Sequence, residues 1–140
     1  MFRDLGRVVL LVENQQKALA FYRDVLGFET LHDEDVAGLR YLHIGLPGQP
    51  TVGLWLMPPM TDEERGLVGR QAGNQPFLVL YTDNLDDVRQ RLAAHDVEVW
   101  AERADDSSRS LHFRDLAGNV IVAAELSVDV EGSSAAPTSR

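Results

Sequence analysis

The sequence predicts an α+β fold made of two βαβββ modules, each a strand, a helix and three further strands. Two observations predict it. Residues 7–28 read as a buried strand followed by an amphipathic helix, and residues 77–99 repeat this pattern about 70 positions later. Two shorter echoes follow at nearly the same offset: RYLHI (40–44) with RSLHF (109–113), and LPGQ (46–49) with LAGN (116–119). Self-similarity of this kind indicates two copies of one structural unit.

The first module opens with RVVLLV at 7–12, which is β-branched and aliphatic as in a buried strand. Asn14 is placed to cap a helix by accepting a backbone N–H of the first turn. Gly27 can supply the left-handed residue that ends the helix. One buried helical face is expected from Ala18, Phe21, Tyr22 and Val25. Strands are expected near 6–13, 28–34, 39–45 and 51–57.

The second module follows the same order. Asn84 is the expected helix cap, and Asp96 stands where Gly27 stood, since aspartate tolerates the left-handed conformation better than most residues. The expected buried face of this helix is Leu85, Val88 and Leu92. Strands are expected near 76–82, 97–102, 109–114 and 119–126. Asp115 and Gly118 form a D-x-x-G turn with a structural role.

A chain of 140 residues suits one domain, expected over 1–128. Within it, module 1 covers about 5–57 and module 2 about 76–127. The polar, Gly/Pro-punctuated stretch 58–75 is the linker, with a short helix around Asp62–Val68. Residues 129–140 form a small-residue polar tail that we expect to be flexible.

Composition narrows the function. The formal charge of −9, without a basic patch, disfavours binding to a phosphate backbone. We therefore expect no nucleic-acid partner. The absence of cysteine excludes disulfides, a thiolate nucleophile and a cysteine zinc site. No apolar run reaches membrane-spanning length and no signal-peptide pattern opens the chain, so we expect no membrane association and a cytoplasmic protein.

Two stretches carry a family resemblance: VENQQKALAFYRDVLGF (12–28) and HFRDLAGNVIVAAEL (112–126). With the repeat, they make the chain similar to the vicinal-oxygen-chelate superfamily, which includes glyoxalase I, bleomycin-resistance proteins and extradiol dioxygenases. The resemblance implies two modules whose sheets form an incomplete barrel around a cavity. It also implies a homodimer, because members build the cavity within a chain or across a dimer.

The family's chemistry uses a divalent metal held by His, Gln or Glu at recognisable positions. Those positions correspond here to Arg7, Phe77 and Val122, and the repeat maps the last of them onto Val52. None of these side chains offers a lone pair to a metal. We therefore expect no metal site and no cofactor, with a divalent metal disfavoured. Glu125 lies three residues past Val122 and is interpreted as an exposed or strand-end charge on the opposite face.

Strand alternation then predicts which residues line the cavity. The lining is expected to be apolar and aromatic, with one cation and two histidines at equivalent places in the repeat. The orientations of Trp55 and Trp100 are left open. His32 and His95 are expected to face solvent. The predicted ligand-binding residues are Arg7, Val9, Tyr41, His43, Val52, Phe77, Tyr81, His112 and Val122.

Three functions are compatible with this lining. The favoured one is a metal-free small-molecule-binding protein similar to the bleomycin-resistance type. The alternative is a glyoxalase- or dioxygenase-like enzyme with a non-standard site built from His43, His112 and Arg7. The third is an assembly or regulatory domain with a vestigial cavity. The sequence assigns no catalytic residue. For Arg7, pairing with a neighbouring carboxylate of the protein, or extension of its charge toward solvent at the start of the strand, is favoured over a role in ligand binding.

Overall fold

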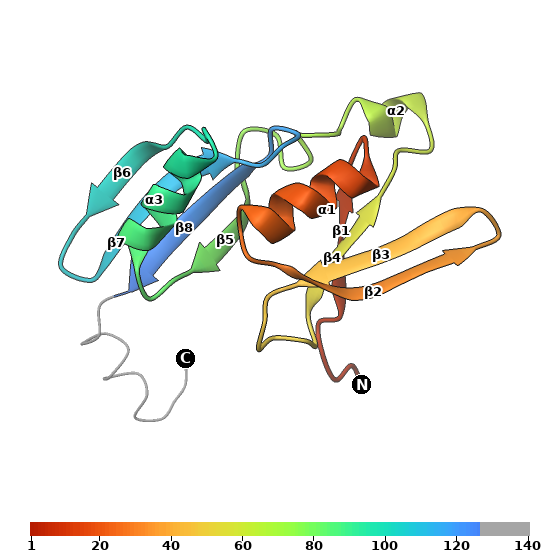
Figure 1. Cartoon of the computed structure of the whole chain (residues 1–140), viewed down its shortest axis with the longest axis horizontal. Helices are drawn as coiled ribbons and strands as arrows, with labels where there is room; N and C mark the ends of the chain where they lie inside the picture. Colours follow the sequence, from red (N-terminus) through yellow and green to blue (C-terminus); the bar gives the residue numbers. More distant parts are fainter. Residues whose placement is uncertain (127–140) are drawn as a thin grey trace. The chain divides into compact units, whose positions relative to one another are not determined.

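The computed structural model describes residues 1–126, so the expected flexible tail at 129–140 lies outside the described residues. The chain forms two compact units. The first comprises Met1–Gly73 together with Asp115–Asn119, and the second comprises Asn74–Arg114 and the strand that begins at Val120. Each unit contains one four-stranded sheet and one long helix (Figure 1). This is the pair of βαβββ modules that the repeat predicts.

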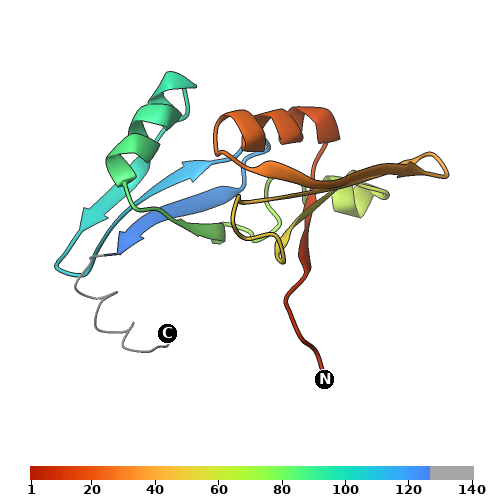
Figure 2. The ribbon, with the colours of Figure 1, turned by 60° about the horizontal axis from the view of Figure 1, so that its bottom comes forward.

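The sheet of the first unit has the order β1-β4-β3-β2, with β1 (Arg7–Leu11) parallel to β4 (Gly53–Met57) and the other neighbours antiparallel. Strands β2 (Glu29–Val36) and β3 (Leu39–Gly45) form a hairpin, with β2 at the edge of the sheet. Helix α1 (Gln15–Asp24) lies on one face of this sheet (Figure 2). The fully buried side chains on that face belong to Leu10, Leu42, Ile44 and Leu56.

The two ends of α1 follow the predicted chemistry. The Asn14 side chain accepts the Lys17 backbone N–H at 2.9 Å, and Gly27 adopts a left-handed φ of 80°. Ala18, Tyr22 and Val25 are buried as predicted, and so is Leu19. Phe21 is only half-buried, although its ring still contacts Tyr22 at a centroid distance of 5.7 Å. The buried face of the helix is therefore rotated slightly from the predicted one.

The second unit repeats this plan with the sheet order β5-β8-β7-β6. Its strands are β5 (Pro76–Tyr81), β6 (Trp100–Ala104), β7 (Ser108–Arg114) and β8 (Val120–Leu126). Helix α3 (Leu85–Ala94) packs on β8, with Leu85 and Leu92 buried. Asn84 caps the helix by accepting the Asp87 N–H at 3.1 Å, and Asp96 follows it with a φ of 59°. Strand β6 starts at Trp100, later than predicted.

Glu125 is more than a strand-end charge. It lies on the helix side of β8, and its carboxylate accepts the backbone N–H of Leu85 at 2.7 Å. The first N–H groups of a helix have no intrahelical partner, so this contact adds a second cap to α3. The side chain is 28% exposed. The predicted orientation, opposite to Val122, and the predicted place at the strand end are confirmed, and the contact with Leu85 leaves the charge partly rather than fully exposed.

The β7–β8 turn, Asp115–Asn119, packs within the first unit, although it joins two strands of the second. One Asp115 carboxylate oxygen accepts the N–H groups of Ala117, Gly118 and Asn119 at 2.9–3.1 Å. The other accepts the Tyr22 hydroxyl at 2.7 Å. The predicted D-x-x-G turn is thus confirmed, and it is also tied to α1.

The segment between β4 and β5 contains α2 (Asp62–Arg65), shorter than the predicted helix. Gly69, with a φ of 80°, packs against the turn so closely that a Cβ there would lie 2.0 Å from the Ala117 carbonyl oxygen. Within the described part of the chain, no helix is long and apolar enough to span a bilayer.

Candidate functional site

The face of the first sheet opposite α1 carries the predicted binding residues of that unit that lie in its strands. The register pairs Val9 with Trp55, and Trp55 with His43. Because neighbouring residues alternate between faces, these side chains point away from the buried Leu54 and Leu56 beneath α1. Tyr41 lies on the same face and its ring stacks on that of Trp55, with centroids 5.8 Å apart. We call this surface the open face of the first sheet.

Arg7 and His43 meet on this open face, as hydrogen-bond partners. The Arg7 Nε donates to His43 Nδ1 at 3.1 Å, and Arg7 Nη1 donates to the Gly6 carbonyl at 2.9 Å. Among residues 1–126, no carboxylate forms an ion pair with Arg7. The alternative in which Arg7 pairs with an acid of the protein is therefore not what the structure contains.

The Arg7 contact fixes the state of the His43 ring. An Nδ1 that accepts a hydrogen bond carries a lone pair, so the proton of the neutral ring sits on Nε2. Burial, followed by the positive charges of Arg7 and His32, lowers the pKa of His43 and keeps the ring neutral. His32 lies beside it, with ring centroids 5.2 Å apart, although its own side chain remains 45% exposed as predicted.

Two N–H donors on the open face lack acceptors. His43 Nε2 and Trp55 Nε1 are buried and have no hydrogen-bond partner in the described part of the chain. Their rings lie 5.3 Å apart. A buried donor without an acceptor costs about 1–3 kcal/mol, so two in neighbouring rings are a substantial local cost. A ligand oxygen placed against them would recover it.

A pocket of about 420 Å³ lies along the β1 edge, and Trp55 is the one of these two rings that lines it. Its walls are mainly apolar and include both Trp55 and the segment around α2. It is lined by Val9, Leu11, Trp55, Met57, Pro58, Met60, Glu64, Leu67 and Gln71. The α2 part of this lining was not predicted from the sequence, because residues 58–75 were assigned to a polar linker. The apolar Met60 and Leu67 were the signal that could have found it.

Gln71 closes the exposed edge of β1. Its side-chain oxygen accepts the Leu11 N–H at 2.7 Å, and its side-chain nitrogen donates to the Val9 carbonyl at 2.8 Å. An amide side chain thereby replaces a neighbouring strand, which protects an edge that would otherwise expose unpaired backbone groups. It also holds the segment after α2 against the pocket.

The register corrects one predicted equivalence. Val122 pairs with Val79 and His112, whereas the matching positions of the first sheet, Val9 and His43, pair with Trp55. Trp55 is therefore the counterpart of Val122. Val52 lies before β4 begins and does not hold that place. The reason is loop length: residues 46–52 separate β3 from β4, but only residues 115–119 separate β7 from β8.

The second sheet has a comparable open face. Val79, Val122 and His112 are register neighbours on it, opposite the buried Ile121. Tyr81 continues the row and is 71% exposed. Phe77 lies at an irregularity in the β5–β8 pairing. The structure thus places the predicted residues in two groups, one in each unit.

Trp100 belongs to the open face of the second sheet. It pairs with His112, their rings being 5.6 Å apart, and the Arg114 guanidinium carbon lies 4.4 Å from the Trp100 ring centre. This cation–π contact, together with the His112 ring, fixes the indole. His112 Nδ1 is buried and lacks a hydrogen-bond partner within residues 1–126, like His43 Nε2 in the first unit.

The residues at the family's metal positions do not fit a metal. Arg7 is a cation and a hydrogen-bond donor, Val122 has no ligating atom, and the indole nitrogen of Trp55 only donates. Across residues 1–126 no group of three or more His, Asp or Glu side chains could hold a metal ion. No metal-dependent step can be derived from this arrangement.

Comparison with known proteins identifies the family of this chain. The family model described as "Glyoxalase/Bleomycin resistance protein/Dioxygenase superfamily" matches residues 4–123. An uncharacterised protein of Shewanella frigidimarina (strain NCIMB 400) is 28% identical over 123 residues, 86% of this chain and 91% of its own length.

Solved structures agree with the family match. UcmS2 is 29% identical with a TM-score of 0.76, over 89% of this chain and 98% of its own. TnmS3, described as an antibiotic binding protein from Streptomyces sp. CB03234, is 26% identical with a TM-score of 0.75, over 90% and 98% of the two chains. The similarity covers both modules in each case.

Proposed function

We propose that this chain, which belongs to the glyoxalase/bleomycin resistance protein/dioxygenase superfamily, works as a small-molecule-binding protein of the bleomycin-resistance type. The open face of the first sheet is its binding surface. One observation carries the proposal: two buried N–H donors in neighbouring rings, on His43 and Trp55, lack acceptors, and Trp55 also lines an apolar pocket of about 420 Å³. A few converging polar groups in a mainly apolar pocket are typical of small-molecule sites.

The same geometry defines the class of ligand. Arg7 and the two N–H groups are all donors, so they select a ligand that carries hydrogen-bond acceptors, such as a carboxylate or a carbonyl. Trp55, Met57 and Met60 offer flat or adaptable apolar contact to the rest of the molecule. The ligand we expect is therefore a small aromatic molecule with a carboxylate or carbonyl group.

Binding without catalysis is favoured by the state of His43. A general base needs a free lone pair, but the Nδ1 lone pair of His43 is already bonded to Arg7 Nε. Its Nε2 carries the proton and can only donate while the ring is neutral. The ring is thus suited to holding an acceptor and unsuited to removing a proton.

The binding function we propose needs no metal. Support comes from the chemistry of the side chains at the family's metal positions, none of which offers a lone pair. Metal content, measured by mass spectrometry on untagged protein purified without chelator, tests this point. We expect less than stoichiometric divalent metal; a stoichiometric metal would contradict the proposal and direct attention to His43 and His112.

A protein of similar structure also supports a role in binding rather than catalysis. TnmS3, 26% identical to this chain, is described as an antibiotic binding protein. We propose that this chain also encloses an organic molecule, with the acceptor-bearing class defined by its own donors on Arg7, His43 and Trp55.

The test is calorimetry with 2-naphthoate, an aromatic carboxylate. Replacing Arg7 with alanine removes the cation and weakens binding by about tenfold, the usual scale for one charge-assisted hydrogen bond. Arg3→Ala is the matched control, because Arg3 is a nearby exposed arginine that pairs with Asp4. Equal affinities of the two variants would remove Arg7 from the site.

We also propose that the protein is a homodimer. Val79 and Tyr81 are 55% and 71% exposed on the open face of the second sheet, and Val9 is 40% exposed on that of the first. Exposed apolar side chains gathered on a sheet face favour burial against another surface. Light scattering should give twice the chain mass of 15.6 kDa, and Tyr81→Asp should shift it to the monomer mass; a monomeric wild type would contradict the proposal.

A further inference from the structure

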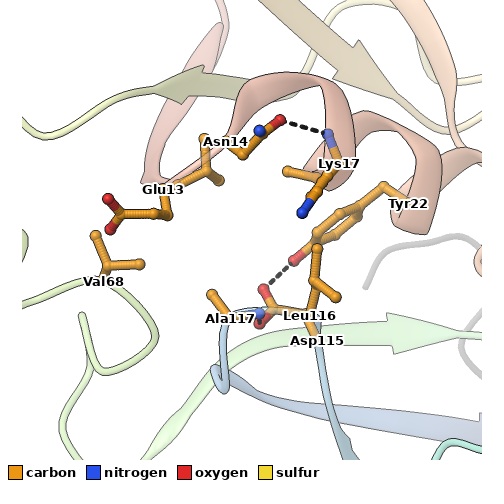
Figure 3. Close-up of a pocket in the computed structure, with 10 residues that line it drawn as sticks. Glu13, Asn14, Lys17, Tyr22, Val68, Asp115, Leu116 and Ala117 are labelled. Atoms are coloured by element: carbon orange, nitrogen blue, oxygen red, sulfur yellow. Dashed lines mark hydrogen bonds between the residues drawn. The ribbon is translucent and has the colours of Figure 1, made fainter.

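A second pocket, of about 520 Å³, lies between the start of α1 and the Asp115–Asn119 turn (Figure 3). It belongs entirely to the first unit and shares no lining residue with the pocket on the open face. Its walls are mainly aliphatic. The lining consists of Val12, Glu13, Asn14, Lys17, Ala18, Tyr22, Val68, Asp115, Leu116 and Ala117.

Lys17 is the cation of this pocket and the single lysine of the 140-residue chain. Figure 3 shows its ammonium group directed toward Tyr22 and Leu116. Lys17 takes part in none of the ion pairs that the described residues form. Lys17 is exposed and lines the pocket without a paired acid among the described residues.

The carboxylate nearest to the floor of the pocket does not neutralise Lys17. Asp115 is only 6% exposed, and its two oxygens accept five hydrogen bonds, from three backbone N–H groups, the Tyr22 hydroxyl and the Asn119 side chain. A carboxylate with this many donors has little remaining capacity to accept. The Lys17 ammonium is thus left for a ligand.

We propose that this pocket binds a small aliphatic carboxylate. The carboxylate would pair with Lys17, and the hydrocarbon part would lie on Val12, Val68 and Leu116. A volume of about 520 Å³ is within the range of small-molecule sites. This site is separate from the one proposed on the open face of the first sheet, and neither depends on the other.

Glu13 lines the opposite side of the pocket, next to Val68 (Figure 3). It repels an incoming carboxylate at longer range, although it forms no ion pair with Lys17. Replacing Glu13 with glutamine should therefore strengthen carboxylate binding by about twofold, a typical size for one exposed charge. A ligand that binds through an amine would instead bind more weakly to Glu13→Gln, and that result would contradict the proposal.

The single lysine permits a site-specific test. Reductive ¹³C-methylation keeps the positive charge and labels two groups, Lys17 Nζ and the terminal amine of Met1. We expect titration with hexanoate to shift the Lys17 resonance saturably while the terminal resonance stays unmoved. Hexanamide, which keeps the chain length but not the charge, should bind about tenfold more weakly.

Variants keep the test decisive. Calorimetry should show hexanoate binding weakened about tenfold in Lys17→Gln and unchanged in Arg23→Gln, a loss of the same charge at the other end of α1. Leu116→Glu places a carboxylate beside Lys17 and should weaken binding about fivefold. Leu5→Glu, at a comparably exposed leucine outside the pocket, is its control.

Three outcomes would overturn the proposal: an unmoved Lys17 resonance at tens of millimolar hexanoate, parallel shifts of both labelled amines, or equal binding of acetate and hexanoate. Each means that no carboxylate site with an aliphatic wall exists at Lys17. None of them bears on the open face, because 2-naphthoate binding there is measured through Arg7. Failure of one site is thus distinguishable from failure of the other.

Discussion

The hydrogen bond between Tyr22 and Asp115 makes a quantitative prediction about stability. The Tyr22 side chain is 1% exposed, and its hydroxyl donates to Asp115 Oδ2 at 2.7 Å. In Tyr22→Phe the carboxylate keeps its backbone donors and Asn119 but loses one short, charge-assisted bond. Such a bond contributes about 1.5–3 kcal/mol, so we expect the free energy of unfolding to fall by about 2 kcal/mol.

Urea unfolding followed by circular dichroism measures this change, and at this chain length the melting temperature should fall by about 4–8 °C. Tyr41→Phe is the control, because the Tyr41 side chain lies on the sheet face away from α1 and its hydroxyl forms no hydrogen bond in the described residues. A loss below about 0.5 kcal/mol in Tyr22→Phe, or equal losses in both variants, would refute the reasoning about a buried charge-assisted bond.

The same bond has a pH signature. Burial, with the charge of Asp115 and the hydrogen bond to it, raises the pKa of Tyr22 well above its usual value of 10. Folding therefore favours the protonated hydroxyl, and this contribution is complete below about pH 10 and is lost as the pH rises through the folded-state pKa. Tyr22→Phe should lack this part of the alkaline loss of stability.

Three further predictions concern other parts of the fold. Gly69→Ala should cost about 2–4 kcal/mol in urea unfolding, because alanine is strained at a φ of 80° and its Cβ would meet the Ala117 carbonyl; a loss under 1 kcal/mol would mean that the segment moves away freely. Since the pKa of His43 is lowered by burial and nearby cations, its contribution to stability is present above about pH 6.5 and is lost below it. His43→Gln should reduce that acid-side loss in urea midpoints, with His95→Gln as control, and an unchanged pH profile would contradict the assignment. Glu125→Ala should cost about 1 kcal/mol by removing the cap at Leu85, and hydrogen exchange in the first turn of α3 should rise; unaltered exchange would mean that the contact does not stabilise the helix end.

Much of the fold was predictable because its signals are local. Asn14 and Asn84 cap the helices that follow them, and Gly27 and Asp96 take the left-handed conformation after each helix. Each of these effects involves residues within one or two turns of the chain. The repeat then assigned the same order of elements to both halves.

The site was less predictable because its contacts join distant segments. The alternation placed Val9 and His43 on one face, but the bond from Arg7 to His43 depends on how β1, β4 and β3 are aligned. That alignment depends on the length of the loop before β4, which differs from its counterpart in the repeat. For this reason Val52 was expected where Trp55 lies.

Gln71 and the Lys17 pocket illustrate a second limit. Gln71 stands 60 residues from Leu11, whose backbone N–H its side chain accepts, in a segment that looks like a polar linker. The Lys17 pocket forms because the Asp115–Asn119 turn packs within the first unit. Neither contact produces a periodic pattern from which it could be predicted in the sequence.

The two indole N–H groups of the chain, on Trp55 and Trp100, offer the most direct test of the binding surface. We would record ¹H–¹⁵N spectra during titration with 2-naphthoate, assign the two signals with Trp100→Phe, and use 2-(aminomethyl)naphthalene as the matched ligand without an acceptor. We expect a saturable downfield shift of the Trp55 signal with 2-naphthoate alone. An unmoved Trp55 signal, or equal shifts with both compounds, would contradict the claim that the open face of the first sheet binds an acceptor-bearing ligand.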